Sequence, residues 1–274
     1  MYPHWTENDV LVDGIQIHYT RTGDGNKPPL LLLHGFSDDG MCWLPVARDL
    51  EAEYDLILPD ARGHGRSARV RPGEDVNMPA DIAGLIRLLG LKKPIIGGHS
   101  MGGSVTSQVA AAYPELVGAL ILEDPGWFVP APREEKEPEP PRSNPWFDFL
   151  LSAAGQSTES IVEKCRADSP LWQEAELLPW ALSKQRFDVH TMETINLRRI
   201  DYLEVVRAIQ CPTLLITADP AMGALVTPEM AGEVMALNPK VREAHVPGVG
   251  HSIRRDDYPG FMSAVRAFLK ETAS

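Results

Sequence analysis

Short apolar runs recur along this chain, and the segments between them carry a helical pattern. The runs lie at residues 30–33, 55–58, 94–97, 119–122 and 213–216. Continuous apolar runs are typical of strands covered on both faces, as the strands of a parallel sheet are. Apolar residues at three- and four-residue spacing fill the segments 43–50, 82–89, 105–112, 230–237 and 261–269. The alternation predicts an α/β fold, with a mostly parallel sheet and helices on both of its faces.

An antiparallel hairpin is predicted ahead of this alternation. Two β-rich segments, residues 10–12 and 15–19, flank the pair Asp13-Gly14. Glycine tolerates a positive φ angle, so an Asp-Gly pair favours the type I′ turn that joins two antiparallel strands.

One long segment interrupts the alternation of strands and helices. Between Gly126 and Gln210 no strand pattern is convincing, and a stretch rich in Pro and Glu is followed by helical patterns at 146–154, 157–166, 173–186 and 190–200. This segment predicts a helical cap at residues 126–210, inserted into a core domain formed by residues 1–125 and 211–274. Four of the six tryptophans fall in the cap, where large residues build a small core or line a pocket.

Composition narrows the classes of partner. The 274 residues carry 26 Lys and Arg against 38 Asp and Glu, a net charge of -12, which disfavours nucleic acids and anionic membrane surfaces. The three cysteines, Cys42, Cys165 and Cys211, are far apart and fit neither a disulfide framework nor a zinc site. The N-terminus resembles no signal peptide, and no apolar stretch reaches transmembrane length. We expect a soluble cytoplasmic protein without a metal, and a homodimer remains open.

The segment Gly98-His99-Ser100-Met101-Gly102 is the strongest local motif. It follows the predicted strand at 94–97 and precedes a helix rich in small residues. A nucleophile on a sharp strand-to-helix turn needs glycines two residues before and after it, because side chains there would collide with the turn. The motif therefore indicates a nucleophilic serine at position 100.

Three further segments, together with this motif, resemble the α/β-hydrolase fold over nearly the whole chain. They are His34-Gly35-Phe36, the loop at residues 59–67, and Gly248-Val249-Gly250-His251. The resemblance implies an eight-stranded, mostly parallel sheet with an inserted helical cap. It also implies Ser100 as nucleophile, His251 as general base and then acid, and the backbone N–H groups of Phe36 and Met101 as the oxyanion hole.

The histidine assignment agrees with the chemistry of the residues. A serine hydroxyl is a poor nucleophile until an imidazole takes its proton. His251 follows a predicted strand at 242–246 and lies in a Gly-rich loop, where it can reach the carboxyl edge of the sheet. We expect His99 to pack beneath the serine turn and His34 to anchor the oxyanion loop by hydrogen bonds. The charged run Arg254 to Asp257 is expected to lie in solvent.

The acid of the triad has three candidates. In many α/β-hydrolases it follows the penultimate strand, but aligning Val226 and Pro228 with that pattern places Gly223 in the acid's position. Other branches carry the acid one strand earlier, where Asp124 ends the run at 119–122. We predict Asp124, with Asp219 and Glu123 as alternatives. Asp219 has a structural interpretation, as a turn residue that bonds nearby backbone.

The predicted reaction is hydrolysis of an ester or lactone by an acyl-enzyme mechanism without a cofactor. A hydrophobic or partly aromatic small molecule would suit the cap, and fungal lactonases that act on resorcylic lactones carry an acid at the place of Asp124. The expected substrate contacts are Gly35, Trp127, Phe128, Trp146 and Trp180.

Other activities of the fold remain as alternatives. Carbon–carbon bond hydrolases share the pattern Ser100-Met101-Gly102-Gly103, and serine amidases share the triad. Some relatives are non-enzymatic ligand receptors that keep the triad. Dehalogenases and epoxide hydrolases of this fold use aspartate where Ser100 stands, which disfavours both.

Overall fold

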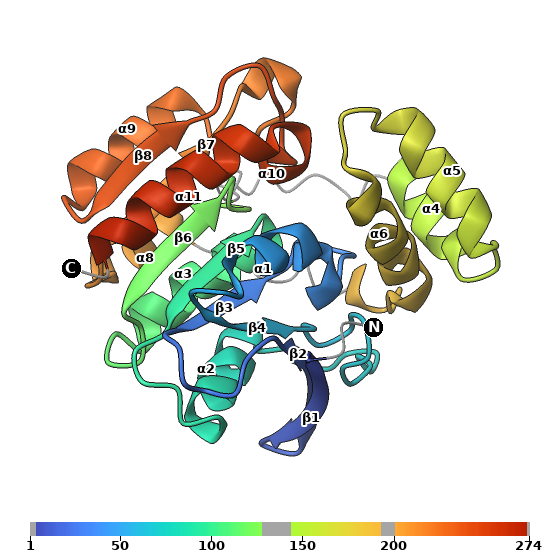
Figure 1. The fold of residues 1–274 in the computed structure, drawn as a ribbon, viewed down its shortest axis with the longest axis horizontal. Helices are drawn as coiled ribbons and strands as arrows, with labels where there is room; N and C mark the ends of the chain where they lie inside the picture. Colours follow the sequence, from blue (N-terminus) through green and yellow to red (C-terminus); the bar gives the residue numbers. More distant parts are fainter. Residues whose placement is uncertain (1–3, 128–143, 193–200, 273–274) are drawn as a thin grey trace, which may run out of the picture.

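A single eight-stranded sheet forms the centre of the molecule (Figure 1). The computed structural model describes residues 4–127, 144–192 and 201–272. In chain order the strands are β1 (Thr6–Val12), β2 (Ile15–Arg21), β3 (Pro29–Leu33), β4 (Asp55–Pro59), β5 (Ile95–His99), β6 (Ala119–Glu123), β7 (Thr213–Thr217) and β8 (Val241–His245). Their spatial order is β1-β2-β4-β3-β5-β6-β7-β8. The predicted fold class is confirmed.

The pairing of the strands follows the predicted topology. Strands β1 and β2 form the antiparallel hairpin, and both turn residues have positive φ, 48° at Asp13 and 83° at Gly14. Strand β2 is also antiparallel to β4, and every pair from β4 to β8 is parallel. The carboxyl ends of the parallel strands therefore meet at one edge, where open α/β sheets bind ligands.

Apolar side chains alternate between the two faces of the sheet. Leu31 and Leu33 of β3 face one buried cluster, and Leu30 and Leu32 face the other. The first cluster is covered by α2 (Met78–Leu88), α3 (Met101–Ala112), α8 (Tyr202–Ala208) and α9 (Pro228–Leu237). The second is covered by η1 (Gly40–Trp43), α1 (Leu44–Leu50), α10 (Ile253–Asp256) and α11 (Tyr258–Thr272). A further short helix, η2 (Pro220–Met222), follows β7.

Three helices of the predicted cap stand together beside the sheet (Figure 1). They are α4 (Pro145–Ala153), α5 (Thr158–Asp168) and α6 (Glu174–Arg186). They enclose a small core of their own, centred on Ile161, Leu177 and Trp180, and α6 contacts η1 and α1 of the main body. Most of the expected helix at 190–200 lies outside the described residues.

Helix α8 falls inside the predicted cap range but packs elsewhere. Its residues Tyr202 and Val206 are buried in the cluster beneath the sheet, together with α3 and α9. We therefore propose that the cap ends before residue 202 instead of at residue 210.

Candidate active site

Ser100 lies on a strained turn between β5 and α3. Its φ of 52° and ψ of -115° are a conformation that side chains rarely adopt. The turn is possible only because both flanking glycines lack a side chain. A Cβ on Gly98 would lie 2.3 Å from the carbonyl carbon of Gly102, and one on Gly102 would lie 2.2 Å from the Leu33 oxygen. The turn presents Ser100 at the carboxyl edge of the sheet, as the motif predicts.

Asp124 and His251 form a close pair at this edge. His251 Nδ1 lies 2.6 Å from Asp124 Oδ2, so the ring donates its Nδ1 proton to the carboxylate. Asp124 is fully buried, and its two oxygens also accept the backbone N–H groups of Leu225 and Val226 at 2.8 to 3.1 Å. The aspartate therefore fixes the imidazole with its Nε2 available for a proton from a neighbouring hydroxyl.

The other two acid candidates are engaged elsewhere. Asp219 accepts the backbone N–H of Gly248 at 2.7 Å and lies 3.1 Å from Nε2 of His245. Glu123 is bound to Arg254. In the described part of the chain, Asp124 is the carboxylate that reaches His251.

His99 joins the serine turn to the histidine loop. Its Nε2 lies 2.9 Å from the backbone oxygen of His251, and the two rings are 4.6 Å apart between centroids. Burial, with His251 as the next cause, holds the pKa of His99 well below its ordinary value. The neutral ring must then carry its proton on Nε2, because a carbonyl oxygen only accepts. The structure therefore brings the turn of Ser100 and the loop of His251 side by side.

The expected oxyanion turn lies against Ser100. A Cβ on Gly35 would meet Ser100 Cβ at 3.6 Å and His99 Nδ1 at 2.7 Å. His34 anchors this turn: its Nε2 accepts the N–H of Ala61 at 2.9 Å and its Nδ1 donates to the Gly35 oxygen at 2.8 Å. Burial lowers the pKa of His34 to about 4, so the ring stays neutral and can both accept and donate.

The two expected oxyanion donors flank the serine on different elements. Phe36 follows Gly35 in the turn after β3, and Met101 is the first residue of α3. The N–H groups in the first turn of a helix have no partner within the helix, so that of Met101 can serve an anion.

The aromatic residues predicted to contact substrate have different surroundings. Trp127 stacks on Tyr202 with ring centroids 5.6 Å apart and donates its indole N–H to Ser107, inside the main core. Trp180 stacks on Phe149 within the core of the cap helices. Trp146 is 37% exposed beside Trp180. Phe128 lies outside the described residues.

A different set of rings surrounds the oxyanion turn. The Phe36 ring lies 4.9 Å from that of Phe187 and 6.5 Å from that of Phe147, measured between centroids. Phe147 comes from α4 and Phe187 follows α6, so the cap helices bring apolar rings to the turn beside Ser100. Neither phenylalanine was among the substrate contacts expected from the sequence.

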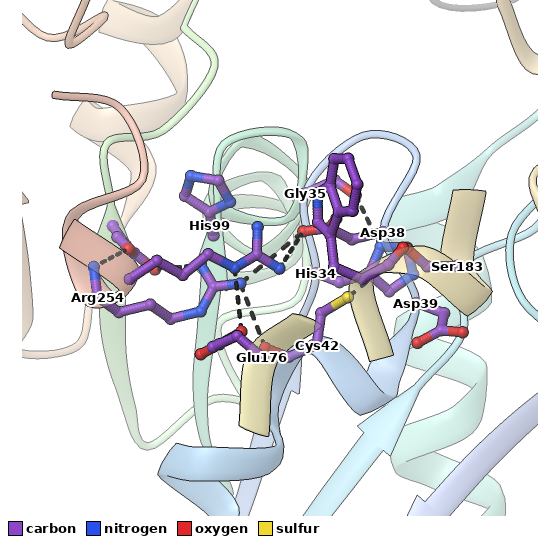
Figure 2. Close-up of polar contacts among 12 residues, drawn as sticks. His34, Gly35, Asp38, Asp39, Cys42, His99, Glu176, Ser183 and Arg254 are labelled. Atoms are coloured by element: carbon purple, nitrogen blue, oxygen red, sulfur yellow. Dashed lines mark hydrogen bonds and ion pairs between the residues drawn. The ribbon is translucent and has the colours of Figure 1, made fainter. Parts of the chain in front are cut away.

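The surroundings of Arg254 and Arg255 differ from what the sequence predicted. Arg254 and Arg255 are 0% and 4% exposed, although the run at 254–257 was expected to lie in solvent. Both arginines pair with buried carboxylates, so ion pairs take the place of water around their guanidinium groups. These pairs belong to a buried ion network, parts of which are drawn in Figure 2. Its members are Asp38, Glu123, Glu176, Lys184, Arg254 and Arg255.

The network was not found from the sequence, although α6 carries a signal. Glu176, Trp180 and Lys184 follow one another at four-residue spacing and therefore share a helix face. The structure shows that this face is buried, so the two charged residues on either side of Trp180 need partners from another element. The spacing does not identify those partners, because they come from the turn before η1 and from α10.

Two features are absent from the residues that the structure describes. No group of three or more His, Cys, Asp or Glu side chains is arranged to hold a metal ion there. No helix in those ranges is both long and apolar enough to cross a membrane.

Several known hydrolases are similar in sequence. Lipase 1 of Psychrobacter immobilis is 27% identical over 94% of this chain and 84% of its own length. Lipase LipV of Mycobacterium tuberculosis is 32% identical over 57% of this chain and 59% of its own. Mouse epoxide hydrolase 4 is 34% identical over 40% of this chain, and the match spans about a third of that relative, 31%.

Solved structures share the fold across nearly the whole chain. A deformylase from Pseudomonas putida S16 superposes with a TM-score of 0.77 at 23% identity, over 95% of this chain and all of the other. An esterase of Thermogutta terrifontis gives 0.73 at 24% identity, over 98% of this chain and all of the other.

The family model described as "Alpha/beta hydrolase family" matches residues 30–264, a range that contains the serine turn, the Asp124–His251 pair and the oxyanion turn. This chain therefore belongs to the alpha/beta hydrolase family.

Proposed function

We propose that the protein is a serine hydrolase that cleaves a carboxylic ester or a lactone. One observation carries the proposal: the fully buried Asp124 carboxylate holds His251 at 2.6 Å, beside the strained turn that presents Ser100. A buried carboxylate fixed by two backbone N–H groups is suited to orient an imidazole and to stabilise its protonated form.

In the proposed mechanism Ser100 Oγ attacks the substrate carbonyl while His251 Nε2 takes the hydroxyl proton. The backbone N–H groups of Phe36 and Met101 stabilise the negative oxygen of the tetrahedral intermediate. His251 then returns its proton to the leaving alcohol, which leaves an acyl group on Ser100. Water, activated by His251, attacks the acyl group and restores the free serine.

Ester or lactone chemistry is favoured by the similar proteins. Lipase 1 and lipase LipV are named as lipases. Ser100 stands at the position where epoxide hydrolases of this fold carry aspartate, which disfavours epoxide opening. The rings of Phe36, Phe147 and Phe187 beside the turn favour an apolar acyl or alcohol group.

A panel of p-nitrophenyl esters and lactones, ranked by kcat/KM, tests the reaction and its substrate class. Ser100→Ala should abolish turnover and labelling by a fluorophosphonate probe, while its circular dichroism stays unchanged. Ser104→Ala is a matched control, because Ser104 lies one turn further along α3. Turnover retained by Ser100→Ala would exclude the serine mechanism. Labelling without turnover on any ester or lactone would favour a binding protein or an amidase.

The acid is tested by comparing Asp124→Asn with Asp219→Asn. Asparagine at 124 can no longer stabilise a protonated imidazole, so kcat should fall by about 10³ or more. Asp219→Asn should stay within about threefold of the parent, because Asp219 bonds the Gly248 backbone and His245. The reverse order would assign the acid to Asp219.

A further inference from the structure

We propose that Lys184, on the cap helix α6, is a positioning residue that holds the oxyanion turn at residues 35–38 in its working geometry. The inference rests on the proposed hydrolase function and adds a role for the cap. In this role the cap helix α6 supports the groups that stabilise the transition state, whether or not it also contacts the substrate.

Lys184 is buried and its ammonium group is fully engaged. The residue is 1% exposed, and Nζ donates to the Ser37 backbone oxygen at 2.9 Å, to Asp38 Oδ1 at 2.5 Å and to Ser183 Oγ at 3.3 Å. An ammonium group has three donors, so this set uses all of them. Two of the three acceptors belong to the turn that follows Phe36.

The oxyanion turn needs such support because it is strained. Ser37 has a φ of 63°, and Asp38 N–H closes the turn by donating to the Gly35 oxygen at 3.1 Å. A non-glycine residue in the left-handed region is strained. Phe36 lies between Gly35 and Ser37. The direction of its backbone N–H therefore depends on the neighbouring peptide planes, which are fixed by the Lys184 bond to the Ser37 oxygen and by the Asp38 bond to the Gly35 oxygen.

The cap also holds Asp38 through a second route. Arg255 donates to Asp38 Oδ2 at 3.1 Å and to Glu176 Oε2 at 3.1 Å, and Glu176 lies two turns before Lys184 on α6. Asp38 and Glu176 are labelled in Figure 2. Burial raises the pKa of the Asp38 carboxyl, but Arg255, Lys184 and Arg254 outweigh it and lower that pKa well below its ordinary value. Asp38 is therefore held as a carboxylate by cations from α6 and α10.

The network thus connects α6 to both halves of the proposed catalytic machinery. Arg254 and Arg255 follow His251 by three and four residues, and Arg254 pairs with Glu123, the residue before Asp124. Three carboxylates and three cations are buried together. Moving α6 off the core would leave charges of the oxyanion turn and of α10 unpaired in a low dielectric, which is strongly unfavourable.

The test compares Lys184→Met with Ile161→Ala. Methionine keeps most of the side-chain volume and removes the ammonium group. Ile161 is fully buried in the cap core and lies outside the network, so Ile161→Ala loosens the cap without touching the turn. For both variants kcat, KM and the affinity for a boronic acid, which places an oxyanion in the hole, are measured well below the melting temperature.

Lys184→Met should lower both kcat and the affinity for the boronic acid by about 10- to 100-fold and leave KM within threefold. The loss should be smaller than that from deleting an oxyanion-hole donor, because the Phe36 N–H is displaced and not removed. Lys184→Arg should recover part of the loss. Ile161→Ala should lower the melting temperature and leave kcat within threefold. A kcat of Lys184→Met within threefold of the parent, or equal losses in both variants, would overturn the inference. If Lys184→Met does not fold, Glu176→Gln makes the same comparison from the same helix.

Hydrogen exchange separates this inference from the proposed function. Amides of residues 35–40 should exchange faster in Lys184→Met than in the parent or in Ile161→Ala, whether or not any ester is cleaved. Faster exchange in Lys184→Met, together with a parent protein that hydrolyses no ester, would leave the positioning role standing and reject the function. Unchanged exchange in that segment would reject the positioning role even if esterase activity is found.

Discussion

Replacing Arg254 by Met should destabilise the protein in a way that depends on pH. The Arg254 guanidinium donates to Glu123 Oε2 at 2.9 Å, and its carbon lies 4.2 Å from the centre of the Trp43 ring. Both charged residues are 0% exposed. Methionine keeps the packing against Trp43 but leaves Glu123 with the Arg254 backbone N–H as its remaining donor in the network, at 2.8 Å.

The magnitude follows from the burial of the unpaired carboxylate. Removing one partner of a buried ion pair typically destabilises by about 3 to 5 kcal/mol. With an unfolding entropy of about 2.1 cal/mol/K per residue over 274 residues, that loss lowers the melting temperature by about 5 to 9 °C. The exposed ion pair of Arg266 with Glu53 provides a control, because Arg266→Met should lower the melting temperature by less than about 2 °C.

The pH dependence has a definite sign. Burial raises the pKa of Glu123 in the parent, and Arg254 is the largest opposing influence. Without Arg254 the pKa of Glu123 rises further, so the folded protein holds a proton that the unfolded chain releases. Stability is then lost as pH rises through the folded pKa. The destabilisation of Arg254→Met relative to the parent should therefore be larger at pH 8 than at pH 5.

The account of the Arg254–Glu123 ion pair is tested by thermal unfolding at pH 5 and pH 8. The four proteins compared are the parent, Arg254→Met, Glu123→Gln and the double variant. The double variant should be more stable than the sum of the two single losses implies, because it removes the buried charge together with its partner. An unchanged melting temperature in Arg254→Met, or strict additivity in the double variant, would refute the account of the buried ion pair.

Three other predictions concern single positions. Ser100→Gly should be more stable to urea than Ser100→Ala by about 1 kcal/mol, because glycine relieves the strained turn; equal midpoints would argue against stored strain. Burial, and then the charge of the neighbouring Asp60, raise the pKa of Asp39, so this pair of carboxyls holds a proton that the unfolded chain releases and stability is lost as pH rises; Asp39→Asn should lose less stability between pH 5.5 and pH 8 than the parent does in urea titrations, and an equal loss would contradict this. Gly102→Ala should prevent folding, because its Cβ would lie 2.2 Å from the Leu33 oxygen. At Gly232 in α9 a Cβ would meet nothing within 4 Å, so Gly232→Ala should stabilise the protein by about 0.5 to 1 kcal/mol. Soluble expression and circular dichroism distinguish the two variants.

The elements of the core were predictable because their signals are local. The run at 30–33 is apolar at every position, and the strand that it forms is covered on both faces. The Asp13-Gly14 pair gave the hairpin, since its two positive φ angles are a property of those residues alone. Ser100 could be located in the same way, because the glycines that its turn requires lie two residues to either side.

The histidine–acid pair could be predicted only by analogy and by exclusion. Asp124 and His251 are 127 residues apart, and neither residue carries a local signal for the other. The structure adds the bonds from Leu225 and Val226 that fix the carboxylate. Asp219 was the second candidate, and its bonds to Gly248 and His245 could be known only from the folded chain.

Local sequence patterns are enough to specify the strands, the hairpin and the serine turn, because each depends on residues close together in the chain. The surroundings of the charged residues depend instead on how distant segments pack. Arginine and lysine usually lie at the protein surface. Arg254 and Lys184 are nevertheless buried, because carboxylates from distant elements neutralise their charges. Burying a charge is favourable only when an opposite charge is brought within contact distance. That proximity is created by the packing of helices and strands, which no local pattern records.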